Sequence, residues 1–171
     1  MSARATAFHE AGHVAACLIL GVEFTTVTTV PGHGYKGQLR GADPDGVAQR
    51  VIVDISGVIA VHLLRGPRLR ESPSVTQSTV SRWVAQDYGR DEFAGQRSVD
   101  LTSFVQHTTR LLAQNWPLVA AIADALQPPC ELSYAQVLAV AGPFLGTATG
   151  REEAKTSPAN NFGQKGDRNR A

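Results

Sequence analysis

Cysteine is scarce in this chain of 171 residues, and its scarcity excludes two kinds of small protein. Only Cys17 and Cys130 are present, and they stand far apart in the sequence. Two distant thiols form neither a disulfide framework nor a cysteine-based zinc site. Both lie in apolar segments with helical spacing, so we expect buried free thiols and a reducing compartment.

The chain also lacks an excess of charge of either sign, a phosphate-binding loop and a secretory signal. Its formal net charge of +1 is not typical of a nucleic-acid or anionic-membrane binder, so we expect no nucleic-acid partner. No GxxxxGK[ST] motif occurs, which excludes an ATP-driven motor of that kind. The apolar run 11–22 is shorter than the ~20 residues that cross a bilayer, and no basic segment precedes it as in a secretory signal. These absences predict a soluble, cytoplasmic protein without a membrane span.

The residues that are present predict a mainly helical protein with a small sheet near its N-terminal third. A helix is expected over Ala3–Leu20 and ends at Gly21, because apolar residues recur there at helical spacing. Val22–Val30 has the period-two pattern of a strand, and Gln38–Arg40 has room to form a short return strand after a glycine-rich turn. Further helices are expected over 47–64, 76–88, 101–115, 116–126 and 133–140.

The composition changes after Gly146. Residues 147–171 are polar and contain Phe162 as their only large apolar side chain. Such a segment buries too little surface to offset the entropy lost on ordering, which predicts a disordered tail. The expected organisation is therefore one domain over residues 1–146 and a polar C-terminal tail over 147–171. The fold class is mainly α (α+β).

The motif with chemical content is His9-Glu10-Ala11-Gly12-His13, inside the first predicted helix. Residues four apart lie on one helix face, so the two imidazoles can bind one zinc ion, with Glu10 beside them as general base. The alternative is an ordinary pair of surface or core histidines. Gly12 weighs against that alternative, because glycine destabilises a helix interior by about 1 kcal/mol. A close approach of another backbone would explain its presence.

The segment from Ala3 to Arg40, with its HEAGH helix and following VTTVPGHGY strand, resembles the protease domain of the FtsH-like, membrane-anchored AAA+ zinc proteases. The stretch SGVIAVHLLRGP resembles the next helix of that family, and the likeness extends more weakly to Val140. The resemblance implies a helical, zincin-type metallopeptidase domain without the AAA+ module or the membrane anchor. It also implies that the strand or its return strand holds substrate in extended form; a plain structural sheet is the alternative.

The third zinc ligand departs from the family pattern. The family has an aspartate where this chain has Val75, or Ser72 or Ser74 in a shifted register, and none of these is an ordinary zinc ligand. In the same register, His62 replaces a family glutamate that faces the metal. His62 is therefore the candidate third ligand beside His9 and His13. A core or supporting histidine is the alternative role for His62, and Glu71 is a further candidate ligand.

Two functions follow as expectations. The first is a zinc metallopeptidase that cleaves accessible polypeptide segments without an ATPase of its own, with Zn²⁺ bound by His9, His13 and His62. The second is a catalytically impaired relative that binds peptides or acts as a scaffold, because the usual aspartate is missing. The sequence leaves the oligomeric state open.

Overall fold

Helix α1 (Ala3–Leu20) is the central element of the fold, with the bounds that its apolar pattern predicts. The computed structural model describes residues 1–32, 36–66 and 101–146, so the helix expected over 76–88 and the tail expected over 147–171 lie outside the described residues. Ser2 caps the helix by accepting a hydrogen bond from the backbone N–H of Ala5, and Gly21 ends it in the left-handed conformation at φ 73°. Every residue from Ala5 to Cys17 is buried except His9, so α1 has a core environment on almost all sides.

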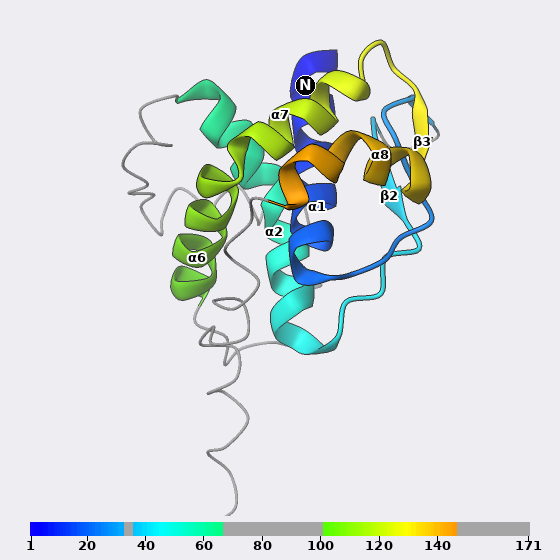
Figure 1. The fold of residues 1–171 in the computed structure, drawn as a ribbon. Helices are drawn as coiled ribbons and strands as arrows, with labels where there is room; N and C mark the ends of the chain where they lie inside the picture. The colour runs from blue at the N-terminus through cyan, green and yellow to red at the C-terminus, as the bar shows by residue number, and fades with distance from the viewer. Residues whose placement is uncertain (33–35, 67–100, 147–171) are drawn as a thin grey trace, which may run out of the picture.

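Three helices surround α1. Helix α2 (Gly46–Arg65) packs against α1 on one side and against α6 (Leu101–Gln114) on the other, and α7 (Trp116–Ala125) packs across the N-terminal half of α1. Phe8 stacks on Trp116 with ring centroids 5.4 Å apart. In Figure 1, α6 lies to the left of α1 and the sheet to its right. The buried apolar side chains of these helices form one continuous core.

The sheet has three short antiparallel strands in the order β2-β1-β3. Strand β1 (Thr26–Thr28) pairs with β2 (Gln38–Arg40) through Val27 opposite Leu39, and with β3 (Glu131–Ser133) through Val27 opposite Leu132. The N-terminal and C-terminal parts of the chain therefore meet in one sheet. Strand β2 stays at its edge within the part of the chain that the structure describes.

Helix α8 (Tyr134–Leu145) follows β3 directly. Ser133 and Gln136 form a capping box at its start. The helix continues through Pro143, beyond the end predicted at residue 140. Only Val137 and Ala141 of α8 are buried, so this helix covers the core without entering it.

The sheet differs from its prediction in two respects. The paired part of the strand expected over Val22–Val30 is only Thr26–Thr28, in which Val27 is fully buried. The period-two pattern failed because Val22 and Phe24 are buried outside the strand while Val30 is exposed. Strand β3 was missed, because three residues with no alternation carry no strand signal.

Among the described helices, α2 alone is long and apolar enough to cross a membrane, judged by length and composition. Of its most apolar stretch, 61% is buried inside the protein, since α1 and α6 cover it. A helix buried in a protein core passes the same test. Packing against α1 and α6 therefore explains the apolar character of α2.

Candidate metal centre

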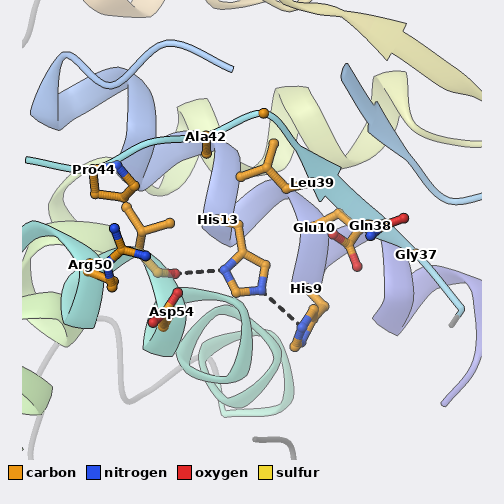
Figure 2. A pocket seen from close by; sticks show the side chains of 12 residues that line it. His9, Glu10, His13, Gly37, Gln38, Leu39, Ala42, Pro44, Arg50 and Asp54 are labelled. Atoms are coloured by element: carbon orange, nitrogen blue, oxygen red, sulfur yellow. Dashed lines mark hydrogen bonds between the residues drawn. The ribbon is translucent and has the colours of Figure 1, made fainter. Parts of the chain in front are cut away.

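His9 and His13 lie one turn apart on α1, and their imidazoles meet. The two Nε2 atoms are 3.1 Å apart, and the rings cross at 77°. Figure 2 shows both rings pointing to a common place at one end of a pocket. The helical spacing in the motif is therefore realised as a convergent pair, as the sequence predicts.

His13 is held by helix α2. Its Nδ1–H donates a hydrogen bond of 2.7 Å to the backbone carbonyl of Val53. With Nδ1 protonated, Nε2 carries only a lone pair, which is the tautomer that metal ligation by this nitrogen requires. Gly57 provides the space for the ring, because a Cβ at this position would overlap Nε2 of His13.

The close approach that Gly12 predicts is present at the same crossing. A Cβ on Gly12 would lie 2.5 Å from the carbonyl oxygen of Ser56 and 2.7 Å from Cβ of Ala60. The two helices can therefore pack backbone to backbone only because residue 12 has no side chain. This close packing brings Val53 within reach of His13.

The distance between the two imidazole nitrogens fits a zinc ion. Two Zn–N bonds of about 2.05 Å at a tetrahedral angle place the nitrogens about 3.3 Å apart. The observed 3.1 Å separation is close to this value. It is also the length of a hydrogen bond between neutral imidazoles, so the pair alone fits both states.

Glu10 lies beside the pair and is buried, with 4% of its surface exposed. Its carboxyl group rests against Gly37, where an added Cβ would come 2.5 Å from Oε1. Burial raises the pKa of Glu10 to about 8 and lowers the pKa of His9 to about 4. A bound cation would oppose the first shift and favour the same neutral His9, because it stabilises a carboxylate and binds a free imidazole nitrogen.

The three motif residues form one end of a pocket of about 320 Å³. One wall is β2 with the residues around it, including Gly37, Gln38 and Leu39, and the other wall is the N-terminal half of α2, including Arg50, Val53 and Asp54. In Figure 2 the pocket extends from the histidines toward Arg50 and Pro44. An edge strand and a pair of imidazoles thus share one cavity.

A third metal ligand is not assembled by residues 1–32, 36–66 and 101–146, where no group of three His, Cys, Asp or Glu side chains is arranged to hold an ion. His62 lies on α2, five residues after Gly57, which places it about 140° around the helix from the face that meets His13. It is half-buried, and its pKa is lowered by burial and by the charge of Arg65. His62 as third ligand stays a prediction, and Glu71, Ser72, Ser74 and Val75 lie outside the described residues.

Sequence reasoning missed the residues of α2 and β2 that complete this site. Val53, Gly57 and Gly37 position the motif side chains through a backbone carbonyl or through the absence of a Cβ. Neither property depends on a chemically distinctive side chain, so no motif reveals it. The sequence offered one sign that α2 lines a polar pocket: Arg50 and Asp54 are four residues apart and so lie on one face of a predicted helix.

Comparison with known proteins adds no relative: neither a scan against protein-family models nor a search of curated proteins finds a match.

Proposed function

We propose that the protein is a zinc-dependent metallopeptidase that hydrolyses accessible polypeptide segments. The observation that carries this proposal is the convergence of two Nε2 atoms beside a buried carboxyl group in an open pocket. This donor set suits zinc, and a catalytic site needs a third protein ligand. His62 is the proposed third ligand, although it is not gathered with the histidine pair among the described residues.

Each residue of the site has a separate chemical role in this proposal. His9 and His13 would hold the ion, and the Val53 carbonyl keeps His13 in the ligating tautomer. When bound, zinc lowers the pKa of a water molecule and polarises the substrate carbonyl. Glu10 would take the proton of that water and deliver it to the leaving amine.

Strand β2 is the element best placed to hold a substrate. It is at the edge of the described sheet, and Gln38 and Leu39 line the pocket that contains Glu10. An extended peptide can add to such an edge through main-chain hydrogen bonds, which give affinity with little sequence preference. This binding mode suits a peptidase that acts on flexible segments.

A second candidate is a catalytically impaired protein that binds peptides or serves as a scaffold. It is favoured by the finding that the described residues gather no group of three side chains able to hold a metal ion. Two imidazoles alone would hold zinc weakly against competing water and chelators. The pocket and the edge strand would remain usable for binding.

The test is zinc content by elemental mass spectrometry together with turnover of a fluorogenic peptide library. Wild type and Glu10→Gln should contain near-stoichiometric zinc, whereas His9→Ala and His62→Ala should lose it. Glu10→Gln should abolish turnover, because it removes the proton acceptor and keeps the ligands. Turnover that survives in Glu10→Gln would refute the mechanism.

Other outcomes separate the two candidates. Zinc and peptide binding without turnover in wild type would favour the binding module. Zinc lost from His9→Ala and retained in His62→Ala would show that the third ligand is another residue, Glu71 being the next to test. Absence of zinc from wild type after zinc is supplied would contradict the peptidase proposal.

A further inference from the structure

The pocket continues beyond the histidines along one face of α2. Gly57 meets His13, Asp54 lies about one turn before Gly57, and Arg50 lies one turn before Asp54. Residues seven apart share a helix face, and at 1.5 Å per residue Arg50 and Gly57 are separated by roughly 10 Å along the axis. Arg50 and Asp54 both line the pocket, with Arg50 at the end away from His9 (Figure 2).

The length of this face corresponds to a short piece of substrate. An extended peptide advances about 3.3 Å per residue, so roughly three residues cover the distance from His13 to Arg50. The guanidinium of Arg50 would then face the third residue from a bond that lies beside the imidazole of His13. A carboxylate at that residue of the peptide would meet the planar guanidinium of Arg50, whose N–H groups are arranged to bind both carboxylate oxygens.

The present partner of Arg50 leaves it available. Its Nη2 is 3.7 Å from Oδ1 of Asp43, which is longer than a good charge-assisted hydrogen bond. The side chains of Arg50 and Asp43 are 54% and 96% exposed, so water weakens their attraction. A carboxylate that enters the pocket and binds the guanidinium through both its oxygens can replace Asp43 at little cost.

We propose that Arg50 binds a substrate carboxylate about three residues from the cleaved bond, so that the pocket selects peptides with an acidic side chain or the C-terminal carboxylate at that place. This specificity rests on the proposed peptidase function for its biological meaning, although binding alone can test it.

The experiment measures binding of fluorescent peptides by anisotropy, using the full chain in the Glu10→Gln form, with zinc and without it. The peptides share one sequence and end in a C-terminal acid or amide, with Glu or Gln as the last residue. Arg50→Gln is compared with Arg110→Gln, which removes the same charge from α6, and with Arg50→Lys, which keeps the charge and loses the planar fork. Arg110 does not line the pocket.

Peptides that carry a carboxylate should bind about three- to tenfold more tightly than the neutral peptide. Arg50→Gln should abolish that ratio, Arg50→Lys should reduce it, and Arg110→Gln should leave it unchanged. A preference for Glu with the amide end identifies a side-chain carboxylate, whereas a preference for the acid end with Gln identifies the terminus. Equal binding of charged and neutral peptides, a ratio that survives Arg50→Gln, or no measurable binding of any peptide would overturn the inference.

This readout separates the inference from the peptidase proposal. If wild type lacks turnover while the Arg50-dependent ratio is present, the specificity stands and the catalytic function fails. If wild type cleaves peptides and the ratio is absent, the catalytic function stands and the role of Arg50 is refuted. Scanning Glu through successive positions of a cleaved peptide then locates the selected residue.

Discussion

Glycine occurs inside the α1–α2 crossing and also in α8, and the two settings are opposite. At the crossing, a Cβ on Gly12 would meet the backbone of Ser56, and a Cβ on Gly57 would overlap the ring of His13. In and after α8, nothing lies within 4 Å of a Cβ built on Gly142 or Gly146. The same residue type is thus a spatial requirement of the candidate site in one region and dispensable for packing in the other.

The two cysteines provide the strongest test of this contrast. Cys17 lies on α1, fully buried, and burial followed by the nearby charge of Asp54 raises its pKa to about 12, whereas Cys130 is half-buried beside β3. Because the thiolate is the reactive form, Cys17 should react with maleimide at least about a hundredfold more slowly than Cys130 at pH 8. Peptide mapping by mass spectrometry after timed labelling measures both rates.

The raised pKa of Cys17 also has a stability consequence. An unfolded thiol ionises near pH 9, so the contribution of neutral Cys17 to stability is fully present below that pH and is lost as pH rises toward 12. Cys17→Ala should reduce this alkaline loss of stability in urea titrations. Equal labelling of the two thiols would show that the crossing opens readily.

The next largest effect is expected for Gly57→Ala. The new Cβ should displace the His13 ring and break its hydrogen bond to Val53, while the gain in helix propensity offsets part of the lost stability. Zinc affinity should fall by about tenfold to a hundredfold or more, measured by competition with a chelator. The Nδ1–H proton resonance of His13 should also move or exchange away in the metal-free protein, which a change remote from the ring would not cause.

Gly146→Ala is the matched control for that experiment. Gly146 has φ −78°, which alanine adopts without strain, and open space at its Cβ. It is a cleaner control than Gly142, which precedes Pro143 and so has a backbone conformation that proline restricts for residues with a Cβ. Unchanged zinc affinity in Gly57→Ala would remove the positioning role of Gly57.

Gly12→Ala should destabilise the fold by about 2 kcal/mol, because the backbone carbonyl of Ser56 cannot rotate away as a side chain can. This loss should exceed the gain of about 1 kcal/mol that alanine brings to a helix interior. Urea denaturation of Gly12→Ala beside Gly146→Ala measures the difference. Equal stabilities would mean that α1 and α2 separate without penalty.

The smallest effect is expected in the peripheral region itself. Ser133→Ala removes the capping box of α8 and should reduce stability by about 1 kcal/mol, with zinc affinity unchanged. The same urea titration and chelator competition measure both quantities. Loss of zinc in this variant would show that α8 and the metal site are coupled, and would weaken the contrast between the two regions.

Much of the local structure could be predicted from the sequence. The bounds of α1 and β2 agree with their predictions, and α2 differs by one residue at each end; Gly21 and Gly66 mark where the two helices end. The pairing of His9 with His13 was also predictable, since it depends only on helical spacing. The cap at Ser133 was predictable from its residue type.

Other features depend on contacts between distant parts of the chain. Strand β3 exists because residues 131–133 pair with β1, about a hundred residues away, and no local pattern marks them. His13 takes its tautomer from a carbonyl on α2, and Glu10 takes its burial from the backbone at Gly37. The position of Arg50 in the pocket likewise follows from how α2 lies against α1.

The sequence by itself therefore determined the histidine pair, the helix that carries it and the adjacent carboxyl group, because these follow from spacing along one helix. Tertiary structure decided which nitrogen of His13 bonds the carbonyl of Val53, how closely α1 and α2 approach, and which side chains share the pocket. The physical reason is that backbone carbonyls and missing Cβ atoms act only on whatever the fold brings beside them. Backbone carbonyls occur in every segment and glycines in many. Packing alone decides which of them contact the side chains of the candidate site.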